Sequence, residues 1–117
     1  MTPGNGIWLT AAISADLPEG GVRAFTAGAV TGFIERTNGQ LLAVSGICTH
    51  QGCRLILASR PDRLVCPCHD ATFALDGAVL AHKFAIPLAA LPRIECREAD
   101  GVVQVYAPSP DLAPPPP

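Results

Sequence analysis

The stretch CTHQGCRLILASRPDRLVCPCH, residues 48–69, carries four of the five cysteines and two of the three histidines of the chain. These six residues fall in two short segments, CTHQGC at 48–53 and CPCH at 66–69. Cysteine thiolates and neutral imidazoles are the side chains that bind soft or borderline transition metals. Each segment supplies a Cys-His pair and one further cysteine, so the pattern predicts a metal site built by two loops.

Two centres fit a set of two cysteines and two histidines. One is tetrahedral zinc, and the other is a [2Fe–2S] cluster with mixed ligation. A zinc finger commonly places its cysteines in one segment and its histidines in the other. Here each segment contributes one of each type, Cys48-x-His50 and Cys66-x-x-His69. This distribution favours a diiron centre in which one iron takes both thiolates and the other takes both imidazoles, with a non-redox zinc module as the alternative.

At these residues the chain resembles the Rieske iron–sulfur family, specifically its disulfide-bearing branch from quinol–cytochrome c oxidoreductases. That branch reads C-T-H-L-G-C and C-P-C-H-G-S, where this chain has CTHQGC and CPCHDA. The resemblance covers the central third of the chain. It implies a Rieske-type antiparallel β-sandwich with a small cluster-binding lobe, and one-electron transfer through a [2Fe–2S] cluster.

The resemblance also implies a role for each of the six residues. It assigns the inner iron to the two thiolates, the solvent-facing iron to the two imidazoles, and a loop-to-loop disulfide to the remaining cysteines. The residues so assigned are Cys48 and Cys66 for the inner iron, His50 and His69 for the outer iron, and Cys53 with Cys68 for the disulfide.

Outward from the two segments, the pattern is all-β. Three Asx-Gly pairs, a strong hairpin signal, each lie between runs suited to strands. The expected hairpins are 29–37 with 40–47, 71–75 with 78–81, and 93–99 with 102–107. A further pair, 55–58 with 63–66, leads into the second segment, and opening strands are expected at 7–13 and 22–26. Both metal-binding segments are therefore expected in loops at strand ends.

Composition indicates one domain. We expect a Rieske domain over residues 1–107, with its lobe at about 47–82, and a proline-rich tail or linker at 108–117. The net charge is −2 and no basic stripe is present, which argues against nucleic acid as a partner. No apolar run approaches the roughly 18–20 residues of a membrane span, and no signal peptide is evident. An extracytoplasmic location is favoured if the disulfide forms and the chain is excised from an anchored protein; otherwise we expect the cytoplasm.

Several positions near the cluster depart from the resembled branch. Ala71 and Phe73 replace a serine and a tyrosine whose hydroxyls donate to cluster and cysteine sulfurs. Because such hydrogen bonds stabilise the reduced cluster, their loss predicts a low-to-middle reduction potential. Asp70 replaces a glycine, and its carboxylate would lower the potential further if it faced the cluster.

Two other departures concern the docking surface. Gln51 replaces an apolar leucine at the tip, and Pro87 is the recognisable part of the usual proline-rich cover, here Phe84-Ala85-Ile86-Pro87-Leu88. Both weaken the case for quinol oxidation specifically. The expected partners are redox proteins, with quinol or a cytochrome as candidates. A soluble Rieske ferredoxin that feeds an oxygenase or reductase is the alternative, although such ferredoxins usually lack the two disulfide cysteines.

Overall fold

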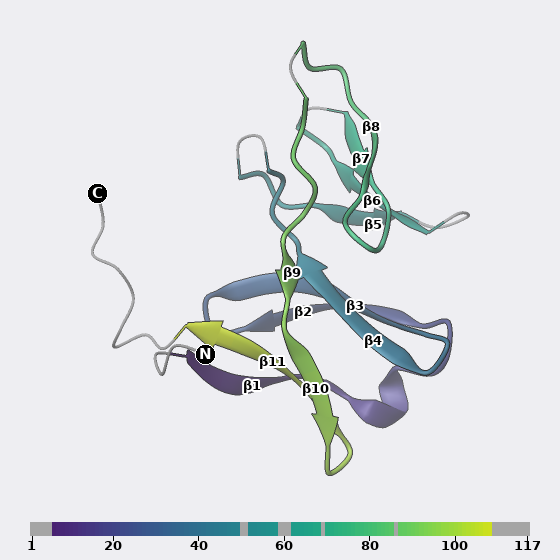
Figure 1. Ribbon diagram of the computed structural model, residues 1–117, viewed down its shortest axis with the longest axis vertical. Helices are drawn as coiled ribbons and strands as arrows, with labels where there is room; N and C mark the ends of the chain where they lie inside the picture. The colour runs from purple at the N-terminus through teal and green to yellow at the C-terminus, as the bar shows by residue number, and fades with distance from the viewer. Residues whose placement is uncertain (1–5, 50–51, 59–61, 69, 86, 109–117) are drawn as a thin grey trace.

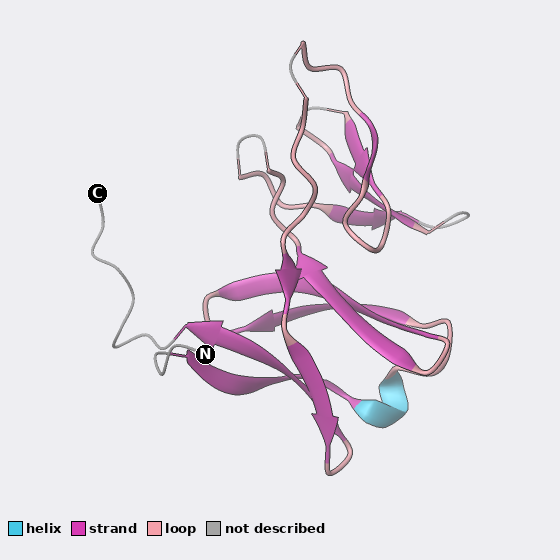
Figure 2. Ribbon diagram, viewed as in Figure 1, coloured by secondary structure: helices cyan, strands magenta, loops and turns pink. Residues whose placement is uncertain are grey.

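The computed structural model describes residues 6–49, 52–58, 62–68, 70–85 and 87–108. These residues form three antiparallel sheets and one short 3₁₀ turn (Figures 1 and 2). In chain order the elements are β1 (Gly6–Ile13), η1 (Ser14–Asp16), β2 (Val22–Ala27), β3 (Val30–Thr37), β4 (Gln40–Ser45), β5 (Ile56–Ala58), β6 (Arg63–Cys66), β7 (Ala71–Phe73), β8 (Val79–Ala81), β9 (Arg93–Ile94), β10 (Cys96–Ala99) and β11 (Val102–Pro108). The all-β expectation is confirmed.

Two of the sheets form a base. One has the strand order β1-β11-β10 and the other β2-β3-β4-β9. Their facing side chains make a core of buried apolar residues, which are Leu17, Phe25, Ala27, Ile34, Ala43, Val103 and Val105. The third sheet, β5-β6-β7-β8, is inserted between β4 and β9 in the chain and forms a separate lobe (Figure 1).

The lobe packs on part of the outer face of the β2-β3-β4-β9 sheet, so the middle of β3 and the end of β4 are covered on both sides. Successive residues of a strand point to opposite faces. On β3, Phe33 joins the lobe core whereas its neighbour Ile34 joins the base core. On β4, Val44 and Ala43 divide in the same way. Burial on both faces at these positions explains why β3 and β4 lack a regular alternation of apolar and polar residues.

The predicted hairpins form. Most of their strands are slightly shorter than expected, but β6 has the expected bounds and β11 is one residue longer. Asn38 and Gly39 have φ of 54° and 75° between β3 and β4, the conformation of a tight two-residue turn. The β7–β8 turn is longer, because the Ala74 N–H donates to the Ala78 carbonyl oxygen and Gly77 has φ of 94°. The opening strand and the strand at 22–26 are also confirmed as β1 and β2.

One predicted strand is wrong. Residues 93–99 do not form a single strand but divide at Glu95 into β9, which pairs with β4, and β10, which pairs with β11. The chain changes sheets at this corner, as strands of packed sheets often do. Apolar alternation continues across the break, so the sequence pattern carried no sign of it. Among the described residues, no helix is long and apolar enough to cross a bilayer.

Candidate metal centre

The first loop follows β4 and is closed by its own backbone. The Cys48 N–H donates to the Cys53 carbonyl oxygen at 2.7 Å, and the Gly52 N–H donates back to the Cys48 carbonyl oxygen at 3.1 Å. Gly52 has φ of 74°, a conformation that a residue without a Cβ adopts at little cost. An isolated bridge between Ile47 and Arg54 holds the base of the loop. This geometry explains the glycine of the CTHQGC segment.

The second loop begins at the last residue of β6, Cys66, and returns into β7 at Ala71. Cys66 and Ala71 are opposite one another in the β6–β7 ladder, so the segment between them forms the connection of a hairpin. Asp70 has φ of 55° in this connection. The left-handed conformation at this position accounts for the glycine of the resembled branch, and aspartate is among the residues that tolerate it best.

The two loops are joined by a disulfide between Cys53 and Cys68, whose Cα atoms are 6.5 Å apart. The Sγ atom of Cys66 lies within 4.8 Å of both disulfide sulfurs. Because those two sulfurs are bonded to each other, Cys66 is the member of this trio suited to bind a metal.

Cys48 and Cys66 take no part in a disulfide, and they are 2% and 0% exposed. Both belong to the lobe core, together with Leu55, Leu64 and Phe73. Thiolates are the ligands of iron–sulfur clusters, and a buried apolar surrounding excludes water from them. The donor set therefore fits the thiolate half of a mixed His/Cys centre.

Three predicted site residues, His50, Gln51 and His69, lie outside the described residues. The imidazole half of the predicted ligand set therefore stays a prediction. Their chain neighbours Thr49, Cys68 and Asp70 are described, and they belong to the two loops that the disulfide joins.

The Asp70 side chain is 70% exposed and its Oδ2 lies 3.3 Å from the Lys83 ammonium nitrogen. The carboxylate thus forms an ion pair with the segment that follows β8. Lys83 is itself 78% exposed, so solvent screens the pair and its contribution to stability is small. Sequence reasoning missed Lys83 because nothing in the local pattern relates it to a residue thirteen positions earlier.

Ala71 and Phe73 are both 0% exposed and belong to the lobe core. They lie on β7, the strand that leaves the second loop. Neither side chain has a hydrogen-bond donor. A hydroxyl placed at either position would therefore be buried in the lobe core, close in sequence to Cys66 and Cys68.

The segment after β8 runs back over the lobe. Phe84 and Leu88 pack partly buried against the lobe core, whereas Pro87 is exposed. The Thr49 hydroxyl donates to the Ala89 carbonyl oxygen at 2.8 Å, which ties this segment to the first loop. Sequence reasoning missed Thr49, although its position between Cys48 and His50 was an available signal.

The all-β scaffold carries two loops that a disulfide joins, and each loop supplies a buried thiol. This arrangement is typical of a small domain that binds a metal cluster. Residues 7–92 match the Rieske [2Fe-2S] domain family, which is most of the chain. The chain belongs to this family, and a Rieske domain binds a [2Fe–2S] cluster and transfers electrons through it.

The relatives agree with this assignment. The chain is 32% identical over 75 residues to the cytochrome b6-f complex iron-sulfur subunit of Chlorobaculum tepidum, covering 64% of this chain and 41% of that subunit. Since it covers 44% of the subunit from Chlorobaculum thiosulfatiphilum, the chain spans less than half the length of these two curated relatives.

Solved structures are similar over more of their length. The plasma membrane Rieske protein PetC3 from Synechocystis PCC 6803 superposes with a TM-score of 0.68 at 30% identity, over 85% of this chain and 99% of PetC3. The ferredoxin of carbazole 1,9a-dioxygenase from Nocardioides aromaticivorans IC177 has a TM-score of 0.57 at 20% identity, over 87% and 98% of the two chains. The second similarity shows the shared fold alone.

Proposed function

We propose that this domain carries single electrons between protein partners through a cluster held by Cys48, His50, Cys66 and His69. The observation that carries the proposal is the placement of two buried thiols, Cys48 and Cys66, in two loops that a disulfide joins. When bound, the cluster supplies a centre that gains or loses one electron at a time.

The protein's own residues supply rigidity. The disulfide holds the two loops at a fixed separation, and the backbone hydrogen bonds between Cys48, Gly52 and Cys53 hold the shape of the first loop. The hydrogen bond from Thr49 to Ala89 adds a third link, to the covering segment. Fixed ligand loops need little rearrangement when the charge of the centre changes, which favours fast electron exchange.

We further propose a reduction potential in the lower or middle part of the Rieske range of about −150 to +300 mV. The support is the burial of Ala71 and Phe73, since no side-chain donor reaches the sulfurs from either position. The carboxylate of Asp70 does not support a lower potential, because it forms an ion pair with Lys83 and is exposed to solvent.

The finer assignment is a role similar to that of the iron–sulfur subunit in quinol–cytochrome complexes, with quinol or a cytochrome among the candidate partners. The names of the Chlorobaculum relatives support it, as does the disulfide. The ferredoxin alternative draws support from the shared fold, but the disulfide argues against it. Because the chain belongs to the Rieske family, we no longer keep the non-redox zinc module as an alternative.

Voltammetry of the purified protein, which measures its reduction potential, tests this proposal. We expect a single one-electron wave within the lower two thirds of the stated range. A potential at the top of the range, or a protein without a reversible wave, would contradict it. Reduction by a water-soluble quinol favours the quinol–cytochrome role, and reduction by a ferredoxin reductase alone favours the alternative.

A further inference from the structure

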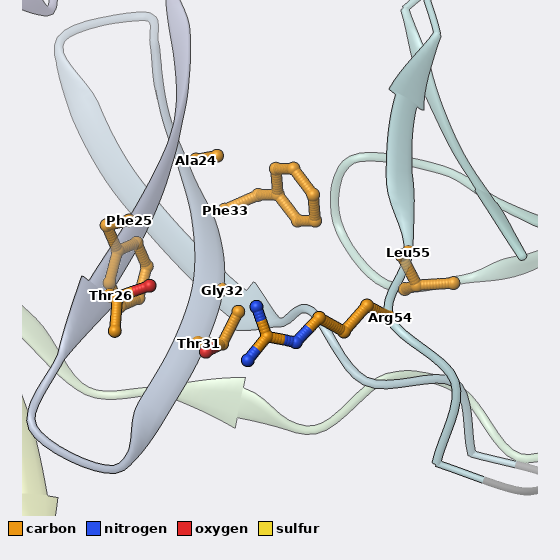
Figure 3. A pocket seen from close by; sticks show the side chains of 8 residues that line it. All are labelled: Ala24, Phe25, Thr26, Thr31, Gly32, Phe33, Arg54 and Leu55. Carbon is orange, nitrogen blue, oxygen red and sulfur yellow. The ribbon is translucent and has the colours of Figure 1, made fainter.

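A groove of about 300 Å³ lies where the lobe meets the base, next to the base of the first loop but lined by none of the proposed cluster ligands. Its walls come from β2, β3 and the residues that lead into β5 (Figure 3). The residues that line it are Ala24, Phe25, Thr26, Thr31, Gly32, Phe33, Arg54 and Leu55. This volume is at the lower end of what small-molecule sites occupy, about 300–1,000 Å³.

The base side of the groove is the outer face of the β2–β3 hairpin. Thr26 is opposite Thr31 in the ladder, and Ala24 is opposite Phe33. Residues two apart on a strand share a face, so these two pairs line the same surface. The surface is therefore apolar at the Ala24–Phe33 pair and carries two hydroxyls at the neighbouring Thr26–Thr31 pair.

Arg54 supplies the charge. Its guanidinium extends from the lobe toward Thr31 and Gly32 on β3 (Figure 3). Within the described residues, the Arg54 side chain has no ion pair and no hydrogen bond. By contrast, Arg36 forms a two-bond ion pair with Glu98, and the Arg97 Nε donates to Gln104.

The charge of this groove differs from that of two other grooves on the surface. One contains Asp16 beside Arg23, whose Nε donates to the Asp16 carbonyl oxygen at 3.0 Å, and the other contains Glu35 beside Arg93. The Arg54 groove has one basic residue and no acidic residue in its lining. A guanidinium fork with no partner among the described residues, beside apolar walls, matches a carboxylate attached to a small apolar body.

We infer that this groove binds a small organic monocarboxylate, with the carboxylate on Arg54 and the apolar body against Phe33 and Leu55. The threonine hydroxyls accept or donate hydrogen bonds at the same end. The inference does not depend on the electron-transfer role, since it concerns a surface that no cluster ligand lines.

Sodium benzoate is the probe that tests the inference. The full chain with its cluster is titrated in the oxidised state, and the backbone amide signals of Thr26, Thr31 and Leu55 are followed by nuclear magnetic resonance. We expect saturable shifts with a dissociation constant of about millimolar, typical of a ligand with so few atoms. Benzamide, which has the same ring without the charge, should bind about tenfold more weakly or worse because the charge-assisted hydrogen bonds are lost.

Two variants complete the test. Arg54→Gln should weaken benzoate binding by about tenfold or more, whereas Arg93→Gln, a change in a different groove, should leave it unchanged. The cluster's visible spectrum in each variant checks that the fold is kept. Shifts that grow linearly without saturation, equal binding of benzamide, or unchanged binding in Arg54→Gln would each overturn the inference.

Discussion

The base and the lobe of this domain are stabilised in different ways. The base strands β1 to β4 are six to eight residues long and enclose a core of their own. The lobe strands β5 to β8 are only three or four residues long, and their core borrows Phe33 and Val44 from the outer face of the base. So small a sheet is marginal alone, and the lobe adds a disulfide and a cluster site where the base relies on packing.

Removal of a thiol ligand should have the largest effect, and it should affect the lobe but not the base. Cys66→Ser and Cys48→Ser take away buried thiolates, so we expect nearly all bound iron to be lost while the base strands persist. Iron per chain and far-ultraviolet circular dichroism measure the two effects. Cys96→Ser is the matched control, because Cys96 lies on β10 against the base core. Full iron occupancy in both ligand variants would contradict the assignment.

Neighbouring residues of β3 separate the two cores. Phe33→Ala should lower the free energy of unfolding by about 3–5 kcal/mol and Ile34→Ala by about 2–5 kcal/mol, because both side chains are buried. The effects on the lobe should differ. Phe33→Ala removes a lobe contact and should speed iron release well below the unfolding transition, whereas Ile34→Ala should not. Equal iron-release rates at a temperature where both variants are folded would refute a separate lobe core.

Loss of the disulfide should affect the lobe more than the base. Its cysteines are 15 residues apart, and closing a loop of that length contributes about 3 kcal/mol in the chain-entropy model. The double variant Cys53→Ala, Cys68→Ala should therefore melt at a lower temperature and release iron faster. Hydrogen exchange should quicken in β6 and β7 before it quickens in β3. Uniform acceleration through both regions would argue against a locally acting bond.

Hydroxyls on β7 should raise the reduction potential. A hydrogen bond that is about 1 kcal/mol stronger in the reduced state raises a one-electron potential by about 40 mV. Ala71→Ser and Phe73→Tyr should each produce an upward shift of this order in voltammetry. Ala43→Ser adds the same hydroxyl to a buried alanine of the base core and should leave the potential unchanged. An absent shift in both lobe variants would remove the stated cause of the low potential.

The smallest effect concerns acid stability of the base. The hydrogen bonds from Arg36 lower the pKa of Glu98 from 4.5 to about 2. Because the folded-state pKa is below the unfolded value, the ion pair stabilises the protein above pH about 4.5, and this contribution is lost as the pH falls toward about 2. Glu98→Gln should flatten that part of the stability–pH curve. Glu95→Gln, at an exposed neighbour, is the control, and an unchanged curve in Glu98→Gln would refute the linkage.

Much of the fold could be predicted because its signals are local. The Asn38-Gly39 pair fixes a tight turn by its own conformational preference, and the β3–β4 hairpin follows. The break at Glu95 could not be predicted, because the exchange of partners there depends on two distant strands, β4 and β11. Packing partners that are far apart in sequence leave no periodic trace.

The site divides in the same way. The pairing of Cys53 with Cys68 agrees with the resemblance, since the motif fixes it. The orientation of Asp70 needed the position of Lys83, and the groove beside Arg54 needed the contact between lobe and base. Both are long-range arrangements that the sequence motif does not contain.

The most direct test of the central claim is electron paramagnetic resonance of the dithionite-reduced protein, with iron and acid-labile sulfide counted on the same sample. The account predicts two irons and two sulfides per chain and a rhombic signal with the low average g value of mixed His/Cys ligation. A silent sample that contains a single zinc ion, or a signal typical of ligation by four cysteines, would contradict it.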